Sequence, residues 1–314
     1  MFKVHGHTIY EIQSLLSESC AIFDSTMSLD ISTLGGWSNI NIRGQYADGN
    51  FVLKLPWRVS KQNPNYYKSL FDISHYYNRL GIAASPLSIG TLPDKNETPF
   101  IIFEYVEGDI HQSVEQFSDY DISLLKESLK ILYRGKPAGL RDYHSPASFL
   151  SATHSRISSH EFLRSCSKVV SQLNTSLSEL LPMVQSHADS LGRWTSSVMH
   201  GDLWFPNIVI QSDKVVLLDF EDCVIGNRFY DLAFFHETPA TSEIMPIPGL
   251  LDRDDAEMVT QLRPIALSYI IIWSIERLLS MEAGCVEPNL STPRVRVAVI
   301  EYTRSKIERL KKLL

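Results

Sequence analysis

Two short segments contain the residues best suited to chemistry. They are His200-Gly-Asp-Leu-Trp-Phe-Pro-Asn207 and Leu218-Asp-Phe-Glu-Asp222. Asn207 follows Asp202 by five residues, and Asp219 follows Asn207 by twelve. The intervening stretch alternates like a β-hairpin, whose two ends return to the same place. The spacing therefore predicts that Asp202, Asn207 and Asp219 converge on one site.

The residue types at this site suit phosphoryl transfer. A loop aspartate can orient a hydroxyl group and take up its proton, while Mg²⁺ bridges the phosphates and prefers hard oxygen ligands such as an Asn carbonyl and an Asp carboxylate. The plain alternative is a β-hairpin flanked by polar turns. Any single aspartate allows that interpretation, but the ordered set argues against it.

These residues resemble the catalytic and metal-binding loops of the aminoglycoside phosphotransferase and choline kinase group of small-molecule kinases, which shares the protein-kinase-like fold. The similarity continues through Gly226-Asn-Arg-Phe-Tyr-Asp231-Leu-Ala. The resemblance implies that Asp202 is the catalytic base, that Asn207 and Asp219 hold Mg²⁺, and that Asp231 is a structural anchor, a helix cap being the alternative for Asp231. We expect His200 to hold the catalytic loop by hydrogen bonds.

The resemblance also implies a fold class and a division of the chain. We expect an α+β, bilobal protein-kinase-like fold, with a β-rich N-lobe over residues 1–106 that covers the nucleotide. A mostly helical C-lobe over residues 107–314 would carry the catalytic loops and the substrate site. Its clearest predicted helices cover residues 122–133 and 162–184, and a second helical block is expected over residues 254–283 and 292–314.

The N-terminal part predicts a glycine turn and an inward-reaching lysine. Alternating residues indicate strands over 28–34, 40–46 and 51–55. The turn Gly35-Gly-Trp-Ser-Asn39 is similar to the family's nucleotide loop, so Gly35, Gly36 and Ser38 are expected to approach ATP phosphates. Lys54 would contact the α- and β-phosphates. The alternatives are an ordinary turn and a solvated strand lysine.

The apolar run Pro99–Gly108 resembles the fifth strand and hinge of this fold. Backbone groups of Glu104 and Val106 would bind adenine there, although the run by itself indicates only a buried strand. One departure from the family concerns the helix predicted over residues 65–80, which contains no Glu to pair with Lys54. Its only acid is Asp72, which either pairs with Lys54 or is a solvated helix residue. In the second case, Lys54 is held in some other way, or the chain is a weak or altered kinase.

Aromatic and acidic residues near Asp202 bear on the acceptor. Trp204 and Phe205 come two and three residues after Asp202, and the acids Glu221, Asp222 and Glu237 come later. Aromatic faces beside acids suit a cationic amino alcohol, whereas packing of Trp204 onto the core is the alternative. Trp204 also resembles the corresponding residue of fructosamine kinases, which phosphorylate sugar adducts, but those have Asp-Pro where this chain has Asp219-Phe.

Composition and charge argue against several other classes of protein. A net charge of −7 over 314 residues and a pI near 5.8 argue against nucleic-acid binding. Four scattered cysteines indicate neither a disulfide framework nor a zinc site. The apolar run 265–275 is too short to span a bilayer, and the first residues do not resemble a signal peptide. We therefore expect a cytoplasmic protein without a membrane or nucleic-acid partner.

The expected function is ATP-dependent transfer of the γ-phosphate to a hydroxyl of a small molecule, with ATP and Mg²⁺ as cofactors. The acceptor could be an amino alcohol, an aminoglycoside or a sugar derivative. The alternative is a catalytically silent kinase-like protein that binds a nucleotide or metabolite as a sensor or partner. A protein kinase is a weaker option, because no Ala-Pro-Glu follows soon after Asp219.

Overall fold

The computed structural model divides the chain into two compact units. The first is Met1–Glu107 with Cys285–Leu290, and the second is Gly108–Gly284 with Ser291–Leu314. The structure describes residues 3–24, 26–37, 39–47, 49–57, 65–240, 249–250, 253–286 and 288–314.

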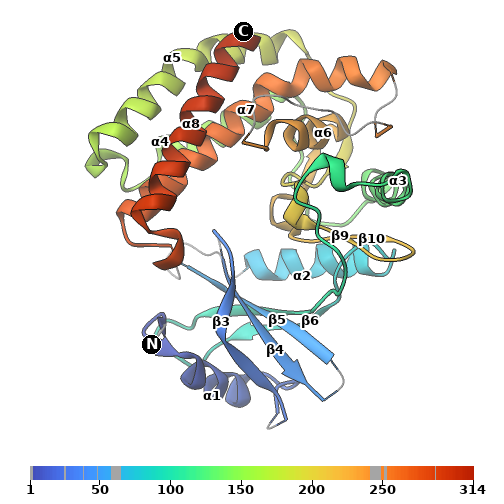
Figure 1. The fold of residues 1–314 in the computed structure, drawn as a ribbon, viewed down its shortest axis with the longest axis vertical. Helices are drawn as coiled ribbons and strands as arrows, with labels where there is room; N and C mark the ends of the chain where they lie inside the picture. Colours follow the sequence, from blue (N-terminus) through green and yellow to red (C-terminus); the bar gives the residue numbers. More distant parts are fainter. Residues whose placement is uncertain are drawn as a thin grey trace. The chain divides into compact units, whose positions relative to one another are not determined.

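A five-stranded antiparallel sheet forms the centre of the first unit, in the order β3-β4-β5-β7-β6 (Figure 1). Its strands are β3 (Ser28–Gly35), β4 (Asn39–Tyr46), β5 (Gly49–Pro56), β6 (Pro86–Thr91) and β7 (Pro99–Glu104). These bounds confirm the strands predicted over residues 28–34, 40–46 and 51–55. A short pair of strands, β1 (Lys3–Val4) and β2 (His7–Thr8), precedes the first helix.

Two helices accompany this sheet. The helix α1 (Ile9–Ser19) begins at a capping box of Thr8 and Glu11, and its apolar residues pack on the sheet face formed by Phe51 and Leu53. The helix α2 (Asn65–Asn78) contacts β6 and β7. Side chains alternate along a strand, so Lys54 lies on the face opposite to that of Phe51 and Leu53.

The second unit is mostly helical. Its helices are α3 (Asp119–Arg134), α4 (Pro146–Ser158), α5 (Lys168–Ser190), α6 (Arg228–Glu237), α7 (Arg253–Glu282) and α8 (Pro293–Leu313). The helix α7 contacts α4, α5, α6 and α8 (Figure 1). Within α7, the stretch Asp255–Glu282 is long and apolar enough to cross a membrane, but most of it is buried, as in the core helix of a globular unit.

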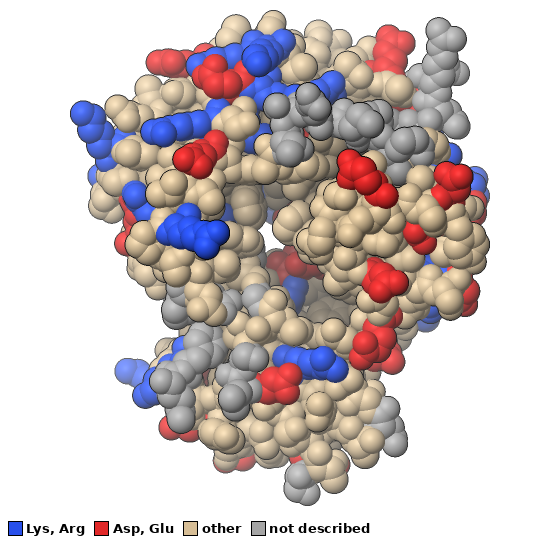
Figure 2. All heavy atoms as spheres, viewed as in Figure 1, with Lys and Arg blue, Asp and Glu red and all other residues tan. Residues whose placement is uncertain are grey.

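Two antiparallel strand pairs position the site in the second unit. The hairpin of β9 (Ile208–Ile210) and β10 (Val215–Leu217) is the one predicted from the sequence. The strand β8 (Ser197–Met199) pairs with β11 (Val224–Gly226). The catalytic loop therefore follows β8, and the segment containing Asp219 lies between β10 and β11. On the face drawn in Figure 2, acidic and basic side chains are interspersed.

Candidate active site

The loop after β8 is packed closely against the segment after β10. Gly201 has a φ of +84°, and a Cβ at this position would lie 2.2 Å from the backbone oxygen of Asp222. Only glycine combines this left-handed conformation with so close an approach. Gly201 therefore lets the two loops that carry the chemical groups come together.

A buried carboxylate holds the start of the catalytic loop. Asp231 on α6 has no exposed surface, and it accepts hydrogen bonds from the backbone amides of His200 (2.7 Å) and Gly201 (2.8 Å). Burial raises the pKa of Asp231 to about 7, against the lowering effect of these two bonds. Asn227 rather than Asp231 caps α6, so Asp231 serves as an anchor for the loop.

The side chain of His200 connects the two loops directly. Its Nε2 lies 2.9 Å from the carbonyl oxygen of Leu218, the residue before Asp219. A carbonyl can only accept, so Nε2 carries the proton, and Nδ1 has no hydrogen-bond partner among the described residues. Burial lowers the pKa of His200 to about 4, so the ring is neutral near pH 7.

This neutral histidine predicts a specific loss of stability in acid. An unfolded histidine titrates at its ordinary pKa of 6.5, whereas folded His200 titrates at about 4. As the pH falls through this window, the unfolded chain takes up a proton that the folded chain does not, so stability decreases. His200→Gln keeps an N–H donor for Leu218 but does not titrate. Between about pH 7.5 and pH 5, its unfolding free energy should fall by about 2 kcal/mol less than that of the wild type. If urea denaturation gave unfolding free energies that changed with pH equally in the two proteins, folded His200 would not have a lowered pKa.

Asp202 and Asn207 are joined within the catalytic loop. The side-chain amide nitrogen of Asn207 donates to the backbone oxygen of Asp202 (2.9 Å) and to its carboxylate Oδ2 (3.0 Å). Because the nitrogen is committed to Asp202, the carbonyl oxygen of the Asn207 amide points away from that carboxylate. Asp202 is half-buried, and burial, followed by the charges of Asp222 and Asp219, raises its pKa well above the usual range.

Asp219 lies beside this pair in an uncommon backbone conformation. Its φ of 64° and ψ of 63° are left-handed, a region that aspartate tolerates better than most residues. The amide of Leu218 donates to the backbone oxygen of Asn207 (2.9 Å), which brings Asp219 to the end of the hairpin where Asn207 lies. The structure thus brings together the three residues predicted to converge, all within the second unit.

The residues present fit a divalent cation. Among the described residues, no three His, Cys, Asp or Glu side chains could hold a metal by themselves. The Asn207 carbonyl and the Asp219 carboxylate would be hard oxygen ligands, to be completed by phosphate oxygens and water. The mutual repulsion of Asp202, Asp219 and Asp222 is also the kind of interaction that a bound cation relieves.

Two residues expected to bind the acceptor are buried elsewhere. Phe205 is 8% exposed and packs on Phe235, with ring centroids 4.9 Å apart. Glu237 has no exposed surface, and its carboxylate pairs with Arg263 (2.6 Å) and Arg309 (2.5 Å). Phe205 and Glu237, both predicted to contact the substrate, are thus engaged within the protein: Phe205 packs in the core, and Glu237 connects α6 to α7 and α8.

The structural role of Glu237 predicts a large effect on stability. Glu237→Ala would leave two guanidinium groups without their common carboxylate, and removing one partner of a buried ion pair costs about 3–5 kcal/mol. Glu308→Ala is the matched control, because Glu308 is exposed and, within the part of the chain that the structure describes, pairs only with Lys311. It should cost less than about 1 kcal/mol. Chemical denaturation measures both. Unchanged stability of Glu237→Ala would contradict the buried-ion-pair account.

The remaining acceptor candidates stay near the carboxylates. Trp204 and Glu221 are partly exposed, and Glu221 contributes to the raised pKa of Asp202, which burial dominates. Two further contacts with this region have no signal in the sequence. The hydroxyl of Tyr269 on α7 donates to Asp222 (2.8 Å), and Arg156 on α4 contacts that hydroxyl. Neither residue lies in a recognisable motif.

In the first unit, Lys54 is 6% exposed and therefore is not a solvated strand lysine. It lies opposite Asn41 on β4 and Ile101 on β7. Gly36 has a φ of +140°, and a Cβ there would lie 2.2 Å from the Asn39 oxygen. Gly35 pairs with Asn41 at the end of β3. Ser38 lies outside the described residues.

Asp72 does not pair with Lys54. Its carboxylate is 55% exposed and makes an ion pair with Lys68, one helical turn earlier on α2, at 2.9 Å. Since Lys54 is buried on the sheet, the geometry supports the interpretation of Asp72 as a solvated helix residue.

The backbone groups at the end of β7 differ in whether they have backbone partners. The strand ends at Glu104, whose amide donates to the carbonyl of Ser85, and the amide of Tyr105 donates to the carbonyl of Asn50. Neither the amide nor the carbonyl of Val106 bonds to another described backbone group. The backbone groups of Glu104 and Val106 are the ones predicted from the sequence to bind adenine.

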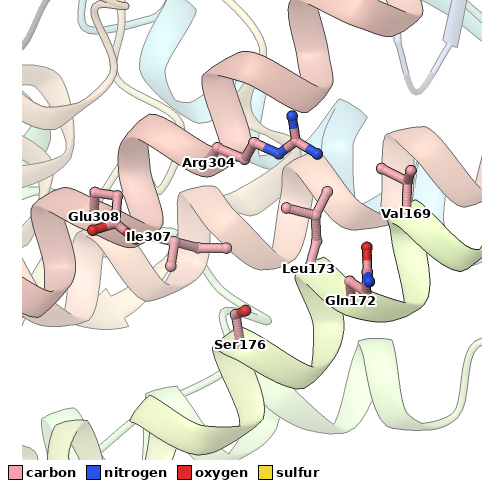
Figure 3. A pocket seen from close by; sticks show the side chains of 7 residues that line it. All are labelled: Val169, Gln172, Leu173, Ser176, Arg304, Ile307 and Glu308. Carbon is pink, nitrogen blue, oxygen red and sulfur yellow. The ribbon is translucent and has the colours of Figure 1, made fainter.

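A hollow on the second unit lies apart from these residues. It is formed by α5 and α8, with Leu173 and Ile307 at its apolar base and Arg304 at its rim (Figure 3). None of the predicted site residues lines it.

The fold and the loops are those of a protein-kinase-like phosphotransferase. Comparison with protein families shows to which family the chain belongs. The model of the phosphotransferase enzyme family (APH) matches residues 31–264, and the chain belongs to this family. No curated protein matches the sequence.

Solved structures show the same fold at low sequence identity. Choline kinase from Cryptosporidium parvum Iowa II has a TM-score of 0.64 at 12% identity, covering 97% of this chain and 94% of that chain. Choline kinase LicA from Streptococcus pneumoniae has a TM-score of 0.60 at 15% identity, covering 94% and 98%. A thermostable mutant of the aminoglycoside phosphotransferase APH(4)-Ia has a TM-score of 0.63 at 12% identity, also covering 94% and 98%. These similarities confirm the α+β, protein-kinase-like fold class.

Proposed function

We propose that this protein transfers the γ-phosphate of ATP to a hydroxyl group of a small molecule. The observation that carries the proposal is the joined pair of Asp202 and Asn207 beside the left-handed Asp219, on loops anchored by Asp231. A related aminoglycoside phosphotransferase was solved with AMP-PNP and hygromycin B. That complex supports a nucleotide and a hydroxylated small molecule as the two substrates here.

Each residue of the second-unit site has a distinct role in this proposal. Asp202 orients the acceptor hydroxyl and accepts its proton as the oxygen attacks phosphorus. Asn207 keeps the Asp202 carboxylate in position through its amide nitrogen, and it holds Mg²⁺ together with Asp219 through oxygen atoms. The bound Mg²⁺ would neutralise charge on the phosphates. His200 and Asp231 hold the two loops together.

The first unit supplies the nucleotide contacts in this proposal. Lys54 would bind phosphate oxygens, with Gly35, Gly36 and Ser38 providing backbone groups, and the backbone at Glu104 and Val106 would bind adenine. The acceptor is an amino alcohol, an aminoglycoside or a sugar derivative. We also propose that the reaction takes place in the cytoplasm.

Binding and turnover test the proposal together. Calorimetry should show that ATP binds more tightly with Mg²⁺ than in EDTA, and ATP consumption should rise with at least one member of a panel of amino alcohols, aminoglycosides and sugars. Mg²⁺-dependent ATP binding without turnover of any panel member would favour the silent binding protein instead. Equal, tight ATP binding in EDTA would contradict the metal assignment.

Lys54 provides a separate prediction. Lys54→Met keeps most of the buried volume and removes the charge, so kcat/KM for MgATP should fall about 10- to 100-fold, the range for a hydrogen bond to a charged group. Asp72→Ala should have no effect, and the double variant should show simple additivity. A strongly non-additive loss would instead show that Asp72 and Lys54 are coupled.

A further inference from the structure

A hydrogen-bonded chain of side chains leads from the catalytic carboxylates to a cation. The Tyr269 hydroxyl donates to Asp222 Oδ2 at 2.8 Å, and Arg156 Nη1 donates to the Tyr269 hydroxyl at 3.3 Å. Asp222 in turn influences the charge state of Asp202. A single hydroxyl group therefore separates the Arg156 guanidinium from the carboxylates around the proposed catalytic base.

Arg156 keeps donors available for a ligand. Its side chain is 40% exposed, with Nη2 bonded to Glu276 at 2.9 Å and the guanidinium over the ring of Tyr269, 5.5 Å from the centroid. Its hydrogen bonds within the described residues go only to Tyr269 and Glu276. A guanidinium has five N–H donors in a planar fork that matches a carboxylate. At least three of these donors therefore have no hydrogen-bond partner among the described residues.

The groups that would suit a cationic acceptor are largely engaged elsewhere. Glu237 is paired with two arginines, Phe205 lies in the core, and Asp222 accepts from Tyr269. A second guanidinium lies next to Glu276, that of Arg277, which stacks over Trp273 at 5.2 Å. Arg156 and Arg277 repel each other, so a bound anion would stabilise both charges.

We infer that the acceptor carries a carboxylate group, which Arg156 binds while Asp202 receives the acceptor's hydroxyl. The inference rests on the proposed function and names the acceptor class for that same site. A carboxylate matches the planar donor fork of the guanidinium and offers it two acceptor oxygens. Arg156 thus determines specificity, and the base is Asp202.

Matched ligands isolate the contribution of the carboxylate. L-serine is ethanolamine with a carboxylate in place of one hydrogen, and D-glycerate has a carboxylate in place of one hydroxymethyl group of glycerol. With MgADP present, calorimetry should show that each acid binds the wild type about 10- to 100-fold more tightly than its partner, the range for a charge-assisted bond. Arg156→Gln should remove this preference and leave ethanolamine and glycerol binding unchanged. Arg156→Lys should retain part of it. Glycerol 3-phosphate tests the dianion, and tighter binding of it than of D-glycerate would overturn the choice of carboxylate.

Two further variants test whether Arg156 binds the carboxylate of the acceptor or has only a structural role through its ion pair with Glu276. Glu276→Gln breaks the same ion pair but frees the guanidinium, so it should keep or strengthen binding of the acids. Arg304→Gln removes an exposed guanidinium at the separate hollow (Figure 3) and should change nothing. If Arg156→Gln and Glu276→Gln weakened binding of the acids equally, Arg156 would have only a structural role. Failure of both acids to bind the wild type would also overturn the inference. Neither outcome affects the kinase proposal, which depends on Mg²⁺-dependent ATP consumption.

Discussion

Asp202→Asn is expected to lower kcat by about 10²–10⁴-fold, the usual contribution of a positioned general base. Asp202 acts on the acceptor hydroxyl in the transition state, so the loss should appear in kcat and leave ATP affinity unchanged. The replacement amide has the same shape, and its oxygen can still accept the hydrogen bond from Asn207. The substitution therefore removes the charge without removing the contact that holds the loop.

Three measurements make the Asp202 result decisive. They are initial rates of ATP consumption with an accepted substrate, calorimetry with MgATP, and thermal melting. We expect the first to fall and the other two to match the wild type. Wild-type turnover by Asp202→Asn would exclude Asp202 as the base, and a parallel loss of melting temperature would show that the rate reflects a damaged loop.

Asp219→Asn is expected to reduce phosphoryl transfer by roughly 10³-fold, because metal stabilisation of transition-state charge is worth several kcal/mol. Asparagine is a better test than alanine, because Asp219 has a left-handed backbone conformation that asparagine also adopts readily. The fold should be retained while the carboxylate ligand is lost. Calorimetry should then show that Mg²⁺ strengthens ATP binding less than in the wild type.

The control for Asp219 is Asp213→Asn, in the exposed turn between β9 and β10. It makes the same change of charge on the same hairpin and should leave both rate and Mg²⁺ dependence intact. If Asp219→Asn kept full activity and full Mg²⁺ dependence, Asp219 would not be a metal ligand.

The convergence of the site was predictable because it is encoded locally. Asp202 and Asn207 belong to one loop, and the hairpin between Asn207 and Asp219 follows from strand alternation and a polar turn. The strands that contain Lys54 and precede Gly36 could be predicted for the same reason. Short-range patterns specify which backbone segments meet, and the family resemblance specified the order in which they occur.

The acceptor side could not be predicted because it depends on distant partners. Glu237 lies four residues beyond the motif that ends with Leu232-Ala233, but its burial depends on ion pairs with Arg263 and Arg309 on later helices. Phe205 adjoins Trp204 in sequence, yet it packs into the core while Trp204 remains partly exposed. Adjacent residues in an irregular loop have no fixed periodicity that would reveal which one is buried.

Other differences come from weak helical signals. The helix α4 was not predicted, since its apolar residues are separated by Ser, Thr and His, and with it Arg156 was missed. The helix predicted over residues 162–184 begins at Lys168, because the side chain of Ser167 caps it and accepts from the Val170 amide. A cap of this kind defines a boundary that apolar periodicity alone does not.

The central claim is that the γ-phosphate of ATP is transferred to an acceptor hydroxyl that Asp202 orients. ³¹P NMR of the protein with MgATP and the acceptor panel tests it most directly, with Asp202→Asn run in parallel. The account predicts that the wild type forms ADP and a new phosphomonoester signal in equal amounts, and that the variant forms both at least about 10²-fold more slowly. Formation of ADP with inorganic phosphate alone, at the same rate in both proteins, would contradict it.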